Sequence, residues 1–156
     1  GVITPNAIGL TMKPALHAYQ NTHPGTALTA DTATKVIFDS TLYDTNSAYD
    51  TSTGLFTVPS GNAGKYFAVS TISMVSSLTN IQPLLYKNSG TSSIDIIRGT
   101  GVYDDAGSSS TVSGTFDLSV GDTVSVYVTQ TQSQSVEGLG SGRQATYFLA
   151  YKLIGA

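Results

Sequence analysis

Residues 49–59 read Tyr-Asp-Thr-Ser-Thr-Gly-Leu-Phe-Thr-Val-Pro, and residues 64–67 read Gly-Lys-Tyr-Phe. The first half of this stretch is rich in Asp, Ser, Thr and Gly, the residues that build turns. A short apolar strand follows over 54–58, and Pro59 ends it because proline has no amide hydrogen to offer a strand partner. Gly64 then opens a second apolar strand. This order of turn, strand, break and strand predicts antiparallel β-structure.

The rest of the chain has the same character. We expect strands near 14–20, 35–39, 54–58, 64–75, 81–87, 93–98, 110–120, 122–131 and 145–154. In 122–131, Val124, Val126 and Val128 alternate with polar residues, which is typical of a half-buried strand. No segment of twelve or more residues has helical periodicity. The sequence therefore predicts an all-β sandwich over 14–156, preceded by a lead-in or linker over 1–13.

Two of these strands, 64–75 and 145–154, are apolar on both faces. Alternating positions place Tyr66, Ala68, Phe148 and Ala150 on one set of faces, and Phe67, Val69, Leu149 and Tyr151 on the other. In a lone sandwich one of these faces would meet water, so we expect another layer or another subunit to cover it. Because no helix is predicted, a contact between subunits is favoured.

The composition argues against several classes of function. Charged residues make up 11% of the 156 residues, the formal net charge is −3, and Ser and Thr together number 42. Without a basic cluster, nucleic acid is not an expected partner. Without an apolar run of roughly 18 residues, membrane insertion is not expected. Cysteine is absent, which excludes disulfides and thiolate chemistry. A surface so poor in charge fits a chain that sister subunits partly cover.

Several motifs in order resemble the globular head of complement component one-q and the related trimeric jelly rolls of the tumour necrosis factor type. The matching residues are Pro14 to Ala18, Tyr49, Asp50, Gly54, Phe56, Pro59, Gly64, Tyr66, Leu118, Gly121, Asp122, Val124, Phe148 and Ala150. The chain departs from the family in four places. It has Leu16 for the usual Phe, Ala68 for an aromatic residue, Ala150 for Gly, and a longer spacer over 60–63. His17-Ala18-Tyr19 is closest to heads of bacteriophage and other viral structural proteins.

The resemblance implies an antiparallel ten-stranded jelly-roll sandwich that forms a homotrimer. By family position, Tyr66, Ala68, Phe148 and Ala150 are expected at the trimer interface. The implied function is a non-enzymatic recognition head, at the C-terminal tip of a viral fibre or surface protein, that binds a host glycan or protein. The implied location of the domain is extracellular or on the virion surface. The alternative is a purely structural domain that caps a trimeric stalk or decorates a capsid.

Ligand contacts are expected in loops, where Tyr offers amphipathic contact area at low entropic cost. The candidates are Tyr43, Tyr49, Tyr103 and Arg143, in or near the loops 40–53, 88–92, 100–109 and 132–144. Asp95, Asp104 and Asp105 offer oxygens of the kind that calcium binds, although their spacing matches no EF-hand loop. Calcium is thus the one cofactor that the sequence suggests, against the plainer interpretation of solvated acidic loops.

Catalytic interpretations are weaker. His17 and His23 lack the elbow motif of a serine hydrolase, and His17 is expected to pack within a strand. The glycine-rich run 138–143 resembles a phosphate loop, but a strand rather than a helix is expected after it. Asp39, Asp44 and Asp50 suggest a carboxylate pair for glycoside hydrolysis, yet Asp is a routine turn former. An enzyme acting on polysaccharide therefore ranks third.

Overall fold

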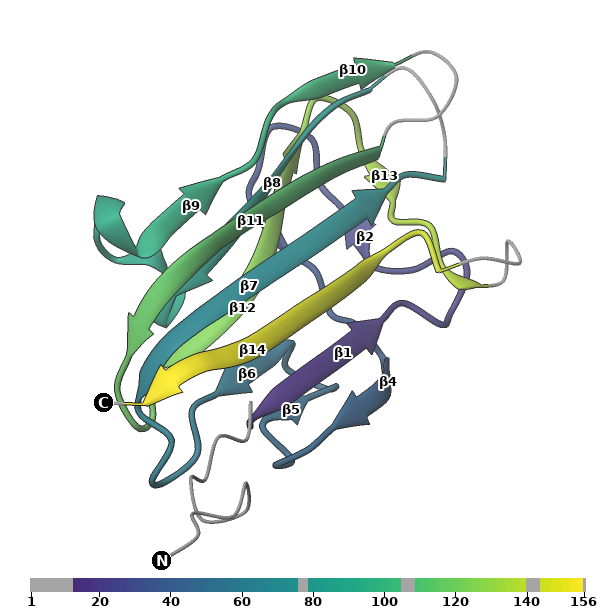
Figure 1. The fold of residues 1–156 in the computed structure, drawn as a ribbon. Coiled ribbons are helices and arrows are strands. Elements are labelled where there is room, and N and C mark those ends of the chain that lie inside the picture. Colours follow the sequence, from purple (N-terminus) through teal and green to yellow (C-terminus); the bar gives the residue numbers. More distant parts are fainter. Residues whose placement is uncertain (1–12, 76–78, 105–108, 140–143, 156) are drawn as a thin grey trace, which may run out of the picture.

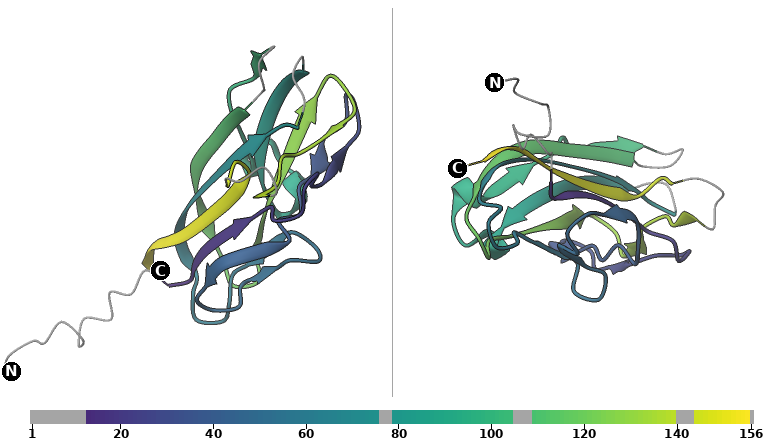
Figure 2. Two further views of the ribbon diagram at one scale, coloured as in Figure 1. Left: turned by 90° about the vertical axis from the view of Figure 1, so that its right-hand side faces the viewer. Right: turned by 60° about the horizontal axis from the view of Figure 1, so that its bottom comes forward.

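The computed structural model describes residues 13–75, 79–104, 109–139 and 144–155, which form two antiparallel sheets packed face to face (Figures 1 and 2). The five-stranded sheet contains, in spatial order, β11 (Ser109–Leu118), β7 (Gly64–Ser73), β14 (Tyr147–Gly155), β1 (Ala15–Tyr19) and β4 (Ser40–Asp44). In Figure 1 this sheet forms the nearer layer, with β7, β14 and β1 side by side.

The second sheet has seven strands. Its order is β10 (Val102–Asp104), β8 (Thr79–Lys87), β12 (Thr123–Gln130), β6 (Leu55–Thr57) and β5 (Tyr49–Asp50), with β3 (Thr34–Lys35) beside β12 and β9 (Ile96–Arg98) beside β8. A small ribbon pairs β2 (Ala27–Leu28) with β13 (Gln134–Ser135). Two 3₁₀ turns, η2 (Asn88–Gly90) and η3 (Ser93–Asp95), follow β8. The predicted all-β sandwich of antiparallel strands is confirmed.

The structure differs from the expected strands in several respects. The strand expected over 35–39 is reduced to β3 (Thr34–Lys35). Ser40–Asp44, which falls in an expected loop, is strand β4 and pairs with β1. Its side chains give no alternating pattern, because Leu42 and Tyr43 are both exposed at this sheet edge. Residues 93–95 form a 3₁₀ turn, so the strand expected over 93–98 begins at Ile96. The described residues form more than ten strands because short edge segments such as β2, β3 and β5 pair separately.

Tight turns connect residues 49–59 with the turn at Gly121 and Asp122. Gly54 adopts a φ of 71°, and its amide donates to the Asp50 carbonyl at 2.8 Å. A side chain is strained in this left-handed region, so glycine suits the turn. Downstream, the Val58 amide donates to the Asp122 carbonyl at 2.9 Å, and the Gly121 amide donates back to the Val58 carbonyl at 3.0 Å. The end of β6 is therefore fixed to the turn between β11 and β12.

The core lies between the sheets and is held by a cluster of aromatic rings. Phe148 stacks on Phe38 with ring centroids 6.0 Å apart and tilts against Tyr49 at 6.1 Å. Phe56 of one sheet meets Tyr66 of the other at 5.8 Å, edge to face. The Tyr66 hydroxyl leaves the core and donates to the Asn62 carbonyl at 2.6 Å, which ties down the spacer between Pro59 and Gly64. Such ring pairs contribute about 0.5–1.5 kcal/mol each beyond the area they bury.

The inner face of the five-stranded sheet contributes to this core the four residues expected at a trimer interface. Tyr66, Ala68, Phe148 and Ala150 are each exposed by 1% or less within a single protomer. Ala68 and Ala150 lie directly opposite each other in β7 and β14. Side chains sealed inside one protomer have no surface to offer a second copy. The structure thus corrects the assignment, and the face that remains for a partner is the opposite one.

Candidate functional site

An apolar surface covers the outer face of the five-stranded sheet. Strand register brings its side chains into rows: Phe67 lies opposite Tyr151, Val69 opposite Leu149, and Leu149 opposite His17. Each of these five side chains is half-buried and alternates with a fully buried neighbour in its strand. We call this surface the outer-face patch and define it as Phe67, Val69, Leu149 and Tyr151 with His17, Tyr43 and Tyr147 around them. It is the second apolar face that the sequence predicts for these strands.

Hydroxyl and ring contacts order one side of the outer-face patch. The hydroxyls of Tyr43 and Tyr151 form a short hydrogen bond across β1, although 108 positions separate the two residues. Burial and this hydrogen bond raise the pKa of Tyr151 to about 12. The ring of His17 lies edge-on to Tyr43 with centroids 5.8 Å apart, and 6.0 Å from Tyr147. These side chains therefore present a preformed surface.

His17 is the titratable group at the centre of the patch. Its Nε2 atom is buried and has no hydrogen-bond partner among the described residues. Burial lowers the pKa of His17 below 6.5, and a side-chain hydrogen bond with Gln144 opposes that shift in part. The imidazole is therefore neutral near pH 7. This agrees with the expected packing role for His17 within a strand, since its contacts among the described residues are Tyr43, Tyr147 and Gln144 rather than a carboxylate.

A polar edge borders the patch on the side of β11. Outward-facing Thr111, Ser113 and Thr115 lie opposite Thr71, Val69 and Phe67 respectively. The hydroxyls of Thr71 and Thr111 hydrogen-bond at 2.8 Å. Lys65 and Asp117 form an ion pair at 3.0 Å that is well exposed and so contributes little to stability. An apolar centre with a polar rim is the usual anatomy of a protein–protein interface.

The four residues expected to contact a ligand lie in different parts of the protein. Tyr49 is 8% exposed and its hydroxyl oxygen accepts from the Phe38 amide at 3.1 Å, so it belongs to the core; this corrects its assignment to a ligand loop. Burial also raises its pKa strongly. Tyr43 is 37% exposed and joins the outer-face patch. The side chains of Tyr103 and Arg143 lie outside the described residues, so their role stays a prediction.

Asp39 and Asp44, which the sequence offers for a catalytic carboxylate pair, both accept hydrogen bonds from backbone amides. Asp39 accepts hydrogen bonds from the amides of Asn21 and Thr22 at 2.7 and 2.9 Å, and Asp44 accepts from those of Ala48 and Tyr49, both at 2.9 Å. Burial raises the pKa of Asp39, but the hydrogen bonds from Thr22 and Asn21 outweigh it and leave the pKa lowered. These carboxylates therefore hold turns.

Asp50 also serves a turn, because its carboxylate accepts from the amide and hydroxyl of Ser52 at 2.8 and 2.6 Å. For calcium, the structure offers only part of a test. Asp95 lies in η3, whereas the side chains of Asp104 and Asp105 are outside the described residues. Within the described residues no three His, Asp or Glu side chains cluster as metal ligands do. A calcium site at these three residues stays a prediction.

Gly138 illustrates why a glycine-rich run need not hold phosphate. A Cβ atom built on Gly138 would lie 1.9 Å from the Thr22 carbonyl oxygen, so the backbone there packs too closely for a side chain. Residues 140–143 are outside the described part of the chain, and the next element among the described residues is strand β14. The packing interpretation accounts for this glycine.

A comparison with known protein families identifies the family of this chain. The model of the C1q domain family matches residues 18–149. The chain belongs to the C1q domain family. Members of this family are non-enzymatic recognition and signalling domains. The viral character suggested by residues 17–19 is a finer statement that this match does not address.

Solved structures share the fold at low sequence identity. The globular domain of zebrafish complement 1qA is 18% identical with a TM-score of 0.67, covering 92% of this chain and 100% of its own. Murine APRIL at pH 5.0 is 17% identical with a TM-score of 0.63, covering 89% and 98%. Eiger TNF from S. frugiperda is 16% identical with a TM-score of 0.62, covering 94% and 96%. A comparison with curated proteins finds no match. These identities establish a common fold and no shared ligand.

No helix among the described residues is long and apolar enough to cross a membrane.

Proposed function

We propose that this C1q domain forms a homotrimeric, non-enzymatic recognition head of a viral fibre or another surface structure, and that it binds a host surface glycan or protein. The observation that carries the proposal is the outer-face patch. The strand register places four apolar side chains next to one another, namely Phe67, Val69, Leu149 and Tyr151. In the described part of the chain, no element of the protomer covers them. Surfaces of this kind usually mark an interaction site.

A second and third copy of the chain are the occupants that best fit this surface. Three copies related by a threefold axis contact each other head to tail, and such contacts close into a ring. A permanent interface of this type typically buries about 2,000 Å² or more. At about 25 cal/mol per Å² of apolar area, the assembly contributes a large part of the stability of the trimer. A charged content of 11% fits such an assembly, because sister copies cover part of the surface of each chain.

The trimer presents three identical copies of each surface outside the patch. Three weak sites on one rigid body bind a multivalent target with far higher avidity than one site does. A host cell surface, which repeats the same glycan or protein many times, is a target of this kind. Such a head works outside the cell or on the virion surface.

The test has two parts. Light scattering coupled to size-exclusion chromatography is expected to give the mass of three 16.2 kDa chains. The fluorescently labelled trimer is then applied to host cells and to a glycan array, and specific saturable binding is expected. A stable monomer contradicts the assembly. A verified trimer that binds neither cells nor glycans leaves the structural alternative, a cap for a trimeric stalk or a decoration of a capsid.

A further inference from the structure

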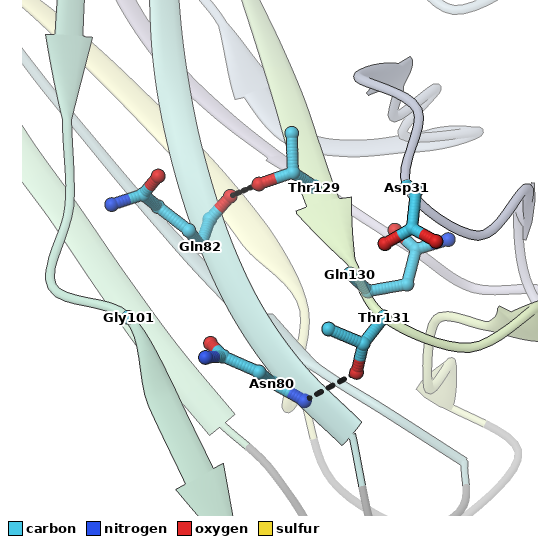
Figure 3. Close-up of a pocket in the computed structure, with 7 residues that line it drawn as sticks. All are labelled: Asp31, Asn80, Gln82, Gly101, Thr129, Gln130 and Thr131. Carbon is cyan, nitrogen blue, oxygen red and sulfur yellow. Dashed lines mark hydrogen bonds between the residues drawn. The ribbon is translucent and has the colours of Figure 1, made fainter.

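A polar pocket lies on the seven-stranded sheet (Figure 3). The outer-face patch belongs to the other, five-stranded sheet. The volume of the pocket is about 380 Å³, at the small end of the range for ligand sites. The ends of β8 and β12 form its walls, and residues 31 and 101 approach from neighbouring segments. Because β8 and β12 belong to the seven-stranded sheet, the pocket is separate from the outer-face patch.

Hydrogen bonds fix the walls of this pocket. The Asn80 amide donates to the Thr131 hydroxyl at 3.2 Å, and the Thr131 amide donates to the Asn80 carbonyl at 3.3 Å. The Gln82 side-chain amide donates to the Gly99 carbonyl at 3.1 Å, which leaves its Oε1 atom as an acceptor. The Asp31 amide donates to the Gln130 carbonyl at 2.7 Å and so holds the Asp31 loop against β12. The pocket is therefore preformed.

Gln130 is a buried residue beside the pocket, and its side chain is held in one orientation. Its side chain is 97% buried, since only 3% of it is exposed, and its Nε2 donates to the Thr29 carbonyl at 2.7 Å. Its Oε1 atom is buried and accepts no hydrogen bond from the described residues. Turning the amide over would break the bond to Thr29, so the orientation is fixed. A buried acceptor without a donor costs about 1–3 kcal/mol. Because solvent does not reach this atom, contacts with a ligand come from the other side chains that line the pocket.

The chemistry of the lining selects the ligand. Asp31 is the charged residue among the described residues that line the pocket, and the others offer amides, hydroxyls and backbone, namely Asn80, Gln82, Gly101, Thr129, Gln130 and Thr131. An anion would meet a carboxylate without a cation beside it. A cation would face a single carboxylate, too little charge to offset the loss of its hydration. Amide and carboxylate oxygens suit a neutral molecule that carries several hydroxyl donors.

We infer that this pocket binds a single neutral sugar unit, held by hydrogen bonds to Asn80, Gln82 and Asp31 rather than by stacking on an aromatic ring. This inference rests on the proposed function, because it names the ligand class and the site through which the recognition head reads a glycan. The sugar hydroxyls donate to the Asp31 carboxylate and to the side-chain oxygens of Asn80 and Gln82.

The experiment titrates the assembled chain with glucose, galactose, mannose and N-acetylglucosamine, with binding followed by saturation-transfer NMR and calorimetry. At least one of these sugars is expected to bind. Asn80→Ala and Gln82→Leu each remove one hydrogen-bond partner, which corresponds to roughly tenfold weaker binding. Asn80 is exposed, so its replacement leaves the core intact. The matched control is Asn46→Ala, because Asn46 is an exposed amide in the turn after β4, far along the chain from the pocket.

The outcomes separate the pocket from the proposed function. Weakened sugar binding in both pocket variants, with Asn46→Ala unchanged, supports the inference. Unchanged affinity in the pocket variants, or binding of calcium or spermidine but of no sugar, overturns it. The same variants are assayed for attachment to host cells. If attachment persists in Asn80→Ala and Gln82→Leu, the recognition function stands and the pocket is not its site; if wild type attaches to no cell or glycan, the function fails as well.

Discussion

Leu149 of β14 lies directly between Val69 of β7 and His17 of β1, opposite one residue in each neighbouring strand. All three side chains point away from the core, since their strand neighbours are the buried ones. One row of the sheet therefore joins two aliphatic side chains to an imidazole that burial keeps neutral. In the proposed trimer this row lies within the contact between copies.

A charge placed in this row is expected to separate the copies. Val69→Asp and Leu149→Asp each put a carboxylate into the interface, where it has no cation partner among the described residues of the outer-face patch. An unpaired charge taken out of water costs several kcal/mol, which is enough to shift the mass from trimer to monomer at micromolar concentration. Light scattering measures the mass, and circular dichroism reports whether the β-structure persists.

The control for these two variants is Val120→Asp. Val120 is also apolar and 52% exposed, but it lies in the turn between β11 and β12. It is expected to leave the mass unchanged. If Val69→Asp and Leu149→Asp remain trimeric while fully folded, the outer-face patch is not the interface.

Stability is expected to depend on pH through His17. Burial lowers the pKa of His17 in the folded chain below 6.5, its usual value in an unfolded chain. Below pH 6.5 the unfolded chain therefore binds a proton that the folded chain resists. The free energy of unfolding falls as pH decreases from 6.5 through the folded pKa, and it levels off below that value.

Urea denaturation between about pH 5 and 8, a window set by histidine titration, measures this effect against a His17→Gln variant. The variant keeps a polar side chain at the same position but has no titrating group there. The wild type is expected to lose more stability than the variant as pH falls from 6.5. A difference between the two that stays constant across the window contradicts a lowered pKa for His17.

The parts of this fold that local chemistry dictates could be predicted from the sequence. The Gly121-Asp122 turn is an example: Gly121 adopts a φ of 84°, and the Asp122 carboxylate accepts from the Ser119 amide at 2.9 Å. The alternating valines of β12 face the core as their period of two predicts. The turn roles of Asp44 and Asp50 are also confirmed by the nearby amides that they accept from, whereas Asp39 accepts from the amides of Asn21 and Thr22 in a distant segment.

Features that depend on pairing between distant strands could not be predicted. In β7 and β14 both faces are apolar, so alternation alone cannot tell which face meets the other sheet, and a shift of one residue exchanges the two. The resemblance placed Tyr66 and Phe148 at the trimer interface, whereas the strand pairing places both in the core. The polar pocket is a second case. Asn80, Gln82 and Gln130 carry no shared motif, and only the pairing of β8 with β12 brings them together.

Removing the hydroxyl of Tyr49 is expected to destabilise the fold. In Tyr49→Phe the buried Phe38 amide loses the acceptor that it reaches at 3.1 Å. A buried donor left without a partner costs about 1–3 kcal/mol. The reference is the wild-type protein, in which this hydrogen bond is intact. Denaturation midpoints at equal protein concentration compare the two; equal midpoints would show that the Phe38 amide gains nothing from Tyr49.

Adding one methyl group at Gly138 is expected to strain the region between β13 and β14. Its Cβ would lie 1.9 Å from the carbonyl oxygen and 2.6 Å from the carbonyl carbon of Thr22, and backbone atoms cannot rotate away as a side chain does. Overpacking of this kind typically costs about 1–3 kcal/mol. In a domain of this size, that lowers the melting temperature by roughly 2–4 °C for each kcal/mol.

The control for Gly138→Ala is Gly101→Ala, where the nearest atom to the new Cβ is the side-chain oxygen of Asn80 at 3.3 Å. Asn80 is exposed and its side chain can turn aside, so this variant is expected to melt within about 0.5 kcal/mol of the wild type, as surface substitutions usually do. Differential scanning calorimetry at one protein concentration measures both variants. A Gly138→Ala protein as stable as Gly101→Ala would mean that the contact between residue 138 and Thr22 yields freely, and that this glycine is not required by packing.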